Sequence, residues 1–251
     1  MFSKLRSLIF KVDPEKAHSL AIKSLKFNLI PNVFDENKND PIFQTKIFDK
    51  ELDNPIGIAA GFDKNAEVYN PLFKLGFGFV EVGTITPLKQ YGNPKPRVFR
   101  LVEDEALINR LGFNNHGAEI VKERIKRNKK LGLLGINIGP NKDSSDRLND
   151  YLIGLKTFYD DADYITINIS SPNTENLRTF HEGDKLQDLL KSIMSERKNL
   201  KSNIPIAVKV SPDISEDQVN KISEILLEYE IKAVIVSNTS EATRDKLSNI
   251  Q

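Results

Sequence analysis

The chain of 251 residues contains no cysteine and only three histidines. Without cysteine it has no disulfides, no thiolate metal ligands and no cysteine nucleophile. The histidines are scattered, at positions 18, 116 and 181, which argues against a histidine metal site. The lack of cysteine fits a cytoplasmic protein.

Long apolar runs are missing as well. No uncharged stretch approaches the roughly 20 apolar residues that a membrane-spanning helix needs. Charges at Lys4, Arg6 and Lys11 interrupt any secretory signal. The net charge is only +1, and no basic tract is interleaved with aromatic residues as in nucleic-acid-binding surfaces. The missing apolar runs favour a globular protein, and the missing basic tract favours one that does not bind nucleic acid, while the net charge by itself decides neither.

The first 38 residues predict an amphipathic helical segment that precedes a domain covering residues 39–251. One helix is expected over residues 2–10, and Asp13-Pro14 caps the start of a second. The second helix carries apolar residues at helical spacing, namely Ala17, Leu20, Ala21 and Leu25. A polar, proline-bounded stretch at residues 31–41 reads as a linker. Residues 1–30 hold six basic and two acidic side chains, which suits either a membrane-surface segment or two surface helices packed on the main domain.

After the linker, short apolar runs alternate with helical stretches, the pattern of parallel βαβ units. The expected strands are Pro55–Ala59, Phe79–Gly83, Leu133–Ile138, Tyr164–Ile169, Ile206–Val210 and Ala233–Val236. The main expected helices are Asn115–Lys130, Asp184–Lys201 and Glu216–Tyr229. This pattern predicts an α/β fold, a (β/α)8 TIM barrel truncated after about six strands. A doubly wound sheet is the alternative, but GxGxxG is missing after the first strand.

Polar residues lie near the end of each of these strands or directly after it. They include Lys64, Thr84, Asn137, Asn168, Lys209, Ser237, Asn238 and Thr239. A single such residue is usually a turn former or helix cap, but the carboxyl ends of barrel strands meet at one mouth. The strand ends offer no histidine and no acidic pair, so metal hydrolysis and glycosidase chemistry lack their parts. The set suits a planar, heteroatom-rich cofactor and a small anionic substrate.

Lys209 is the most unusual member of this set because it lies inside an apolar strand. A lysine is rarely buried without a partner. It could face outward at a strand edge, form an ion pair in the core or bind a ligand.

Eight motifs in the chain resemble the class 2, quinone-dependent dihydroorotate dehydrogenases, flavoenzymes of pyrimidine (UMP) biosynthesis. The motifs are GIAAGFDKNAE (57–67), EVGTITP (81–87), NPKPRVFRL (93–101), INRLGFNNHG (108–117), GINIGPNK (135–142), YITINISSPNT (164–174), IAVKVSPD (206–213) and SNT (237–239). They span nearly the whole chain in the family's order and spacing. The resemblance implies oxidation of (S)-dihydroorotate to orotate, with FMN as hydride acceptor and ubiquinone or menaquinone as final acceptor.

The resemblance also implies roles for particular residues. FMN would be bound by Ala60, Gly61, Phe62, Asp63, Lys64, Thr84, Asn137, Asn168, Lys209 and Ser237. Dihydroorotate would be held by Lys64, Asn109, Arg110, Leu111, Gly112, Phe113, Asn168, Asn173, Asn238 and Thr239. Ser171 would be the catalytic base, where class 1 relatives use cysteine, with Thr174 and Phe113 shaping the proton exit. His18 and Arg100 match quinone-site positions, which implies peripheral contact with the cytoplasmic face of the cell membrane. The oligomeric state stays open, with a monomer as one possibility.

The chain departs from this family after its sixth strand, because two further strands with phosphate-binding glycine loops are expected there. We therefore expect the polypeptide as given to be a fragment that binds flavin poorly and folds marginally, which flavin absorbance of the purified chain tests. Two alternatives remain open. One is a related soluble FMN-dependent dihydropyrimidine or dihydroorotate oxidoreductase with another acceptor. The other is a non-catalytic remnant that keeps the orotate pocket.

Overall fold

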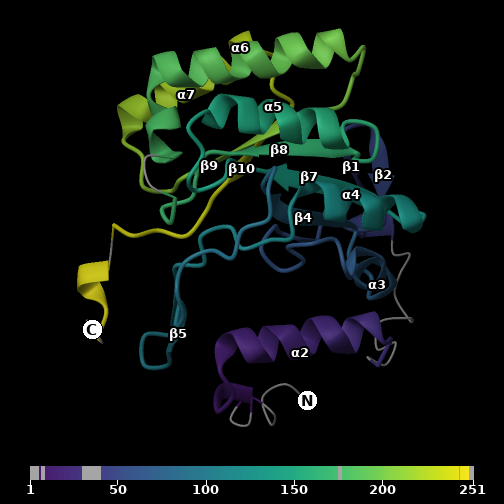
Figure 1. The fold of residues 1–251 in the computed structure, drawn as a ribbon, viewed down its shortest axis with the longest axis vertical. Coiled ribbons are helices and arrows are strands. Elements are labelled where there is room, and N and C mark those ends of the chain that lie inside the picture. The colour runs from purple at the N-terminus through teal and green to yellow at the C-terminus, as the bar shows by residue number, and fades with distance from the viewer. Residues whose placement is uncertain (1–5, 7–8, 30–40, 175–176, 243, 249–251) are drawn as a thin grey trace.

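A six-stranded, all-parallel sheet forms the centre of the computed structural model, which describes residues 6, 9–29, 41–174, 177–242 and 244–248 (Figure 1). The strands are β3 (Gly57–Ile58), β4 (Phe79–Ile85), β7 (Leu133–Ile138), β8 (Tyr164–Asn168), β9 (Ile206–Val210) and β10 (Ala233–Val236). They match the six strands expected from the sequence. Their order across the sheet is β10-β9-β8-β7-β4-β3, so neighbours in space are also successive in the chain. In a doubly wound sheet the order of successive strands reverses part-way across the sheet. The uninterrupted order seen here is that of a barrel wall, and the sheet curls accordingly.

Strands β7 and β8 form the buried middle of this sheet, and every residue of both is buried. Burial of successive residues on both faces is typical of parallel strands that are covered on both sides. The strand register places Asn137 opposite Thr166 and Asn168 opposite Lys209. The pairing therefore brings the polar residues of neighbouring strands to the same level of the barrel.

Helices cover the outer face of the sheet. They are α3 (Tyr69–Lys74), α4 (Ala118–Arg127), α5 (Arg147–Phe158), α6 (Gly183–Asn199) and α7 (Glu216–Glu228). The three helices expected from the sequence are confirmed as α4, α6 and α7, while α3 and α5 escaped prediction. Short 3-10 turns lie at Pro41–Phe43, Leu177–His181 and Arg244–Lys246. Helix α5 begins at Arg147 and is capped by Asp146, whose carboxylate accepts a hydrogen bond from the backbone amide of Asn149.

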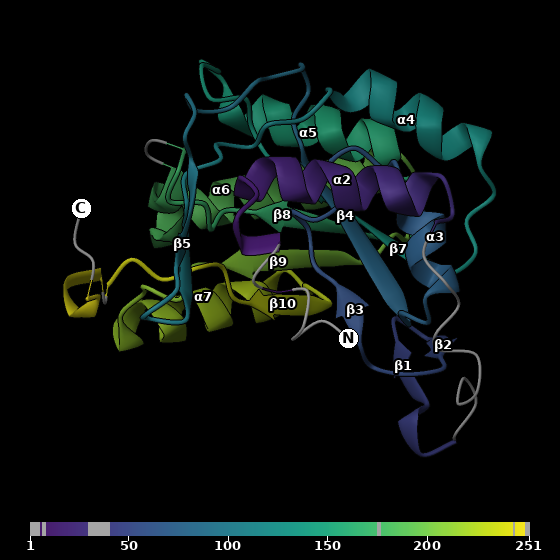
Figure 2. The ribbon, with the colours of Figure 1, turned by 90° about the horizontal axis from the view of Figure 1, so that it is seen from below.

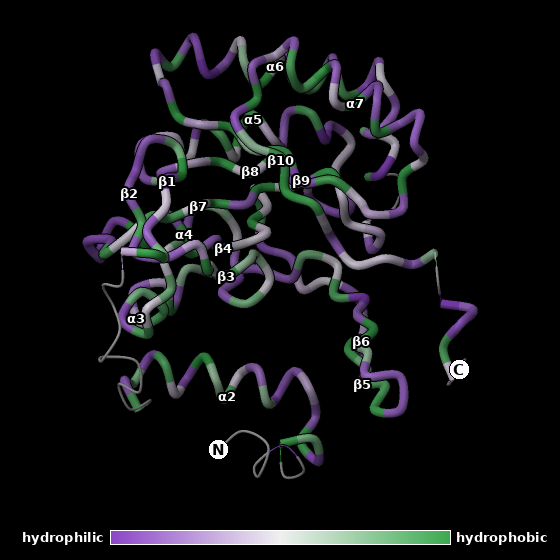
Figure 3. The backbone as a smooth tube through the Cα atoms, turned by 180° about the vertical axis from the view of Figure 1, so that it is seen from behind, coloured by the Kyte–Doolittle hydropathy of each residue, from purple (hydrophilic) through white to green (hydrophobic). Residues whose placement is uncertain are grey.

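Two antiparallel hairpins also escaped prediction. β1 (Thr45–Ile47) pairs with β2 (Lys50–Leu52), and this first hairpin packs Phe48 against Tyr164 at the start of β8, with ring centroids 5.2 Å apart. β5 (Val98–Leu101) pairs with β6 (Ala106–Asn109). Figure 3 shows this second hairpin projecting away from the sheet beside the C-terminal segment. The amide of Ser248 donates to Asp104 in its turn, so the hairpin and the last described residues are joined.

Helix α2 (Pro14–Lys26) lies on the opposite side of the molecule from α6 and α7, and Figure 2 views the structure from that side. The Asp13 side chain accepts from the Lys16 amide at 2.9 Å, as its sequence predicts for a helix cap. Leu25 is buried, but Leu20 is 57 % exposed, so the apolar residues at helical spacing are only partly covered by the barrel. Most of the expected first helix (residues 2–10) and of the linker lies outside the described residues. None of the described helices is long and apolar enough to cross a membrane.

Candidate active site

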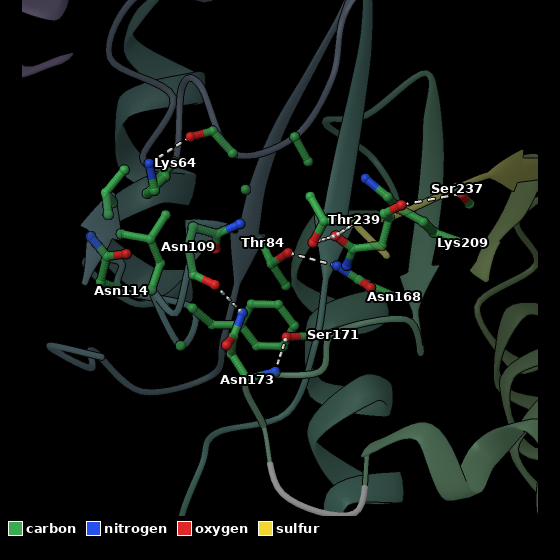
Figure 4. A pocket seen from close by; sticks show the side chains of 18 of the residues that line it. Lys64, Thr84, Asn109, Asn114, Asn168, Ser171, Asn173, Lys209, Ser237 and Thr239 are labelled. Atoms are coloured by element: carbon green, nitrogen blue, oxygen red, sulfur yellow. Dashed lines mark hydrogen bonds between the residues drawn. The ribbon is translucent and has the colours of Figure 1, made fainter. Parts of the chain in front are cut away.

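A cavity of about 430 Å³ opens where the carboxyl ends of the strands meet (Figure 4). Many of the residues singled out from the sequence line it. They are Ala60, Gly61, Lys64, Thr84, Asn109, Leu111, Gly112, Phe113, Asn168, Ser171, Asn173, Lys209, Ser237, Asn238 and Thr239. The topology of the sheet and hairpin β5–β6 thus gathers side chains from six separate motifs around one cavity.

Lys209 lies in this cavity with 8 % of its surface exposed. It is therefore neither an outward-facing surface lysine nor a member of a core ion pair, because its ammonium group pairs with none of the residues that the structure describes. A buried cation without a partner is costly unless a ligand supplies one. The geometry favours the third of the possibilities raised by the sequence, a ligand-binding lysine.

Amide and hydroxyl side chains form a continuous hydrogen-bonded network beside Lys209. The Thr84 hydroxyl donates to Asn137 Oδ1 at 2.7 Å, and Asn168 Nδ2 donates to Thr84 Oγ1 at 2.9 Å. Ser170 Oγ donates to Asn168 Oδ1 at 2.7 Å and accepts from Asn238 Nδ2 at 2.9 Å. The network fixes these side chains, so the cavity presents a preformed polar wall.

Ser171 lies on another side of the cavity, with 4 % of its surface exposed. Its hydroxyl oxygen accepts a hydrogen bond from the backbone N–H of Asn173 at 3.2 Å. Thr174, one turn further on, is buried, and its hydroxyl has no partner among the described residues. Buried polar groups are normally paired, so the Thr174 hydroxyl is available to a ligand or water.

Lys64 and Gly61 form the opposite rim of the cavity. The Lys64 ammonium donates to the Gly61 carbonyl at 2.5 Å. Burial lowers the pKa of the Lys64 ammonium, although the negative charge of Glu15 partly offsets this effect. Gly61 has a φ of +110°, and nothing lies within 4 Å of where a Cβ would stand. The backbone there is strained for any residue other than glycine, and it borders open space that a flat ligand could approach.

Some predicted residues lie outside the cavity lining: Phe62, Asp63, Arg110, Asn137 and Thr174. The Asp63 carboxylate accepts from the amides of Asn65, Glu67 and Val68, so it stabilises a turn, and burial raises its pKa. Arg110 donates to the Pro96 carbonyl. Asn137 is fully buried under the polar wall.

Other lining residues were not assigned from the sequence, namely Gly83, Val98, Leu107 and Asn114. All but Leu107 fall inside motifs that the resemblance had quoted, so position within a motif was the available signal. Asn114 is notable because its buried Oδ1 has no partner among the described residues. Leu107 comes from the second hairpin, which the sequence did not predict.

His18 and Arg100 lie away from the cavity, at the junction of the N-terminal segment and the barrel. His18 Nε2 lies 2.7 Å from the Phe62 carbonyl, and its ring meets the Phe62 ring edge-on at 5.5 Å. Arg100 donates to the Val12 carbonyl at 2.7 Å and covers the ring of Phe10. Burial lowers the pKa of His18. Among the described residues, no group of three potential metal ligands lies together.

Comparison with known proteins places this geometry in context. The profile of the dihydroorotate dehydrogenase family matches residues 42–249. A dihydroorotate dehydrogenase (quinone) from Agrobacterium fabrum is 46% identical over 245 residues, covering 96% of this chain and 67% of the relative. The protein of the same name from Bartonella tribocorum is 48% identical over 250 residues, covering 97% and 68%. The chain thus spans about two thirds of the length of these relatives.

Solved structures agree with the sequence comparison. DHODH from Eimeria tenella in complex with ferulenol superimposes with a TM-score of 0.88 at 37% identity, covering 94% of this chain and 69% of that one. The ligand-free form gives 0.87 at 36% identity, covering 95% and 72%. Matches of this extent establish common descent as well as a common fold. The chain belongs to the dihydroorotate dehydrogenase family, in its quinone-dependent class.

Proposed function

We propose that the chain carries the site that oxidises (S)-dihydroorotate to orotate, the fourth step of de novo pyrimidine biosynthesis, with FMN as hydride acceptor and a membrane quinone as final acceptor. Its family membership and the names of its relatives support this proposal. The observation that carries it is the placement of Ser171 and the unpaired Lys209 in one cavity.

The residues present fit a flavin ring. FMN, when bound, supplies a reversible acceptor for a hydride. Gly61 borders open space, so a flat ring could lie against the backbone with Ala60 beside it. Lys209 would donate to the ring's carbonyl edge and stabilise negative charge there, since its ammonium has no described partner. Thr84, Asn168 and Ser237 line the same side.

The remaining polar groups suit a small cyclic amide with a carboxylate. Lys64 would neutralise the carboxylate of dihydroorotate, and the amides of Asn109, Asn173 and Asn238 would bond the imide edges. Thr239 and the loop Asn109–Phe113 would complete the pocket. Each of these residues except Arg110 lines the cavity. Arg110 itself would hold the loop in place through the Pro96 carbonyl.

Ser171 would act as the base that removes the C5 proton of dihydroorotate. The backbone N–H of Asn173 already donates to Ser171 Oγ. It would therefore stabilise the negative charge that develops as the hydroxyl gives up its own proton. A serine hydroxyl is a weak base, which needs a water-poor site and a path for that proton. The unpartnered hydroxyl of Thr174 would receive it while passing its own proton on toward solvent, with Phe113 closing the cavity.

The electrons would leave to ubiquinone or menaquinone near α2. His18 and Arg100 both join the N-terminal segment to the barrel. A quinone bound between this segment and the barrel would lie beside Phe62, in the turn that would border the flavin. The basic N-terminal segment would contact the cytoplasmic face of the membrane peripherally, because such segments are attracted to anionic lipid.

Anaerobic reduction of FMN by dihydroorotate tests this proposal. The chain is saturated with FMN, dihydroorotate is added, and bleaching of the flavin absorbance is followed. Ser171→Ala should slow bleaching by about two to four orders of magnitude while leaving orotate affinity, measured by calorimetry, within about threefold. The exposed Ser195→Ala variant serves as control. Orotate binding without any bleaching of the FMN-loaded wild-type protein would instead indicate a non-catalytic remnant.

A further inference from the structure

Glu81 is a buried carboxylate that the proposed chemistry does not use. It lies in β4 with 3 % of its surface exposed. Asn137 Nδ2 donates to its Oε1 at 2.9 Å and the Thr166 hydroxyl donates to its Oε2 at 2.7 Å. It forms no ion pair with the described residues, so neutral donors alone compensate its charge. Burying a charge in this way is costly, which calls for a reason why an apolar residue does not occupy the position.

The hydrogen-bond directions above Glu81 supply that reason. An ionised carboxylate only accepts hydrogen bonds, so the amide of Asn137 must turn its NH2 group toward Glu81. Asn137 Oδ1 is then directed away, where it accepts from the Thr84 hydroxyl and from Asn168 Nδ2 at 3.1 Å. Since the Thr84 proton is used on Asn137, the Thr84 oxygen accepts from Asn168.

A backbone group fixes the other end of the same chain of bonds. The Ser170 amide, which can only donate, bonds to Asn168 Oδ1 at 3.1 Å. Asn168 must therefore direct its oxygen toward Ser170 and its NH2 group toward Thr84 and Asn137. An acceptor-only group at one end and a donor-only group at the other enforce one direction on every bond between them. An amide that flipped in the middle would place two donors face to face.

We propose that Glu81 is a positioning residue that, together with the Ser170 amide, sets the hydrogen-bond polarity of the cavity wall at Thr84 and Asn168. This inference rests on the proposed function, because the wall is the surface that would meet FMN and dihydroorotate. Glu81 does not touch the cavity. It acts through Asn137, and through it determines which wall atoms donate and which accept.

The proposal predicts that an acceptor at position 81 matters more than its charge. In Glu81→Gln, the side-chain oxygen would accept from Asn137 while the NH2 group donates to Thr166, whose hydroxyl turns to accept. The direction of the network above is then preserved. In Glu81→Met, which has a similar volume, the NH2 group of Asn137 loses its acceptor, and only the donor Asn168 Nδ2 on the other side still opposes a flip of that amide.

Two measurements on the whole chain test this. FMN affinity by fluorescence titration should fall at least about tenfold in Glu81→Met, the effect of one orphaned buried donor, and stay within about threefold in Glu81→Gln. Thr166→Val, which removes the second donor to Glu81 without reversing Asn137, should also stay within about threefold. Thermal unfolding of each variant identifies any that is merely unfolded.

Side-chain NH2 exchange of Asn137 and Asn168, measured by NMR in protein labelled on asparagine, provides a readout that needs no ligand. Protection should be present in wild type and in Glu81→Gln, and lost in a folded Glu81→Met. If wild type fails to bind FMN, the proposed function fails, and the exchange data still decide the role of Glu81. Retained protection in folded Glu81→Met would overturn the inference, as would equal loss of protection in the Gln and Met variants.

Discussion

At the scale of single residues, Lys209 connects the sequence most directly to the chemistry. It lies in the apolar strand β9 at the level of Asn168, and the described residues supply no anion for it. The folded chain therefore bears the cost of burying an ammonium group, which the proposed flavin would compensate when it binds. Sites shaped for a ligand often reduce the stability of the empty protein in this way.

Replacing Lys209 by methionine should separate those two effects. Lys209→Met removes a buried, unpaired charge while keeping a similar side-chain volume, so the ligand-free protein should melt at the same temperature as wild type or a few degrees higher. FMN affinity should fall more than about tenfold, because a charge-assisted bond is lost. Thermal unfolding and fluorescence titration check the two outcomes. Lys191→Met on exposed α6 is the matched control, and a variant that kept full FMN affinity would remove Lys209 from the site.

At the scale of elements, buried ion pairs fasten segments that the sheet does not hold. Arg97, 6 % exposed, donates to both carboxylate oxygens of Glu15 in α2 and to the carbonyls of Tyr91 and Asn93. The hydrogen bond from Arg97 lowers the pKa of Glu15. At the opposite end of the barrel, Asp163 accepts from Lys50 of β2, from Lys130 and from the Leu134 amide.

Removing the N-terminal segment should impair the reduction of quinone but not the oxidation of dihydroorotate. Without residues 1–40, the chain loses His18 and the surface against which Arg100 packs, while the cavity keeps its lining. Reduction of quinone should therefore fall more than about tenfold, whereas bleaching of bound FMN by dihydroorotate should persist. Parallel assays with quinone, fumarate and NAD make the comparison. Undiminished quinone reduction would show that the N-terminal segment does not form the quinone site, whereas activity with fumarate or NAD in place of quinone would favour a related soluble enzyme.

Asp163 should give the fold a measurable acid dependence. Burial alone would raise its pKa, but the bonds from Leu134, Lys130 and Lys50 hold the pKa below its usual value of 3.8. A lowered folded-state pKa means that the stabilisation is complete above about pH 4 and is lost as the pH falls through the folded-state value. Asp163→Asn should lose about 3 kcal/mol at pH 7 and most of this dependence.

Urea unfolding between pH 3 and 7 measures both quantities for Asp163→Asn. The exposed Asp188→Asn variant should follow wild type throughout. An Asp163→Asn curve parallel to that of wild type across the acid range would show that Asp163 does not control the acid response.

At the scale of the whole molecule, the described sheet has two open edges, β3 and β10. Val234 and Val236 of β10 are 47 % and 80 % exposed, and Leu227 of the neighbouring α7 is 79 % exposed. Exposed apolar edge strands template pairing between molecules. Poor flavin binding and marginal folding of the isolated chain remain predictions from the sequence, and this exposed edge points in the same direction.

The isolated chain should therefore self-associate as its concentration rises. Val234→Lys places a charge on the exposed face of β10, away from the cavity, and should shift association to concentrations at least about tenfold higher. Light scattering across a concentration series measures the shift. Val219→Lys, on the exposed face of α7, tests whether added charge alone is responsible. Equal behaviour of wild type and Val234→Lys would show that β10 is not the contact surface.

The sequence by itself determined the sheet strands, three of the barrel helices and most of the residues that line the cavity. The strands and helices depend on local periodicity, and the strand-end residues depend on the rule that the ends of parallel strands meet. The loop Asn109–Phe113 and the role of Ser171 came instead from the resemblance to the family. The two hairpins were missed because their strands are short and pack against distant segments. Helix α5 was missed because its capping residue, Asp146, stands among other polar residues and is not distinctive in the sequence.

Only the tertiary structure decided what individual polar side chains do. Asp63 stabilises a turn instead of facing the cavity, Lys209 has no described partner, and Glu81 lies beneath the cavity wall. Glu81 and Asn137 are 56 positions apart, and a hydrogen bond between them depends on strand register and side-chain direction together. These properties emerge when the sheet assembles, because the energy of a buried polar group is set by neighbours that are remote in sequence.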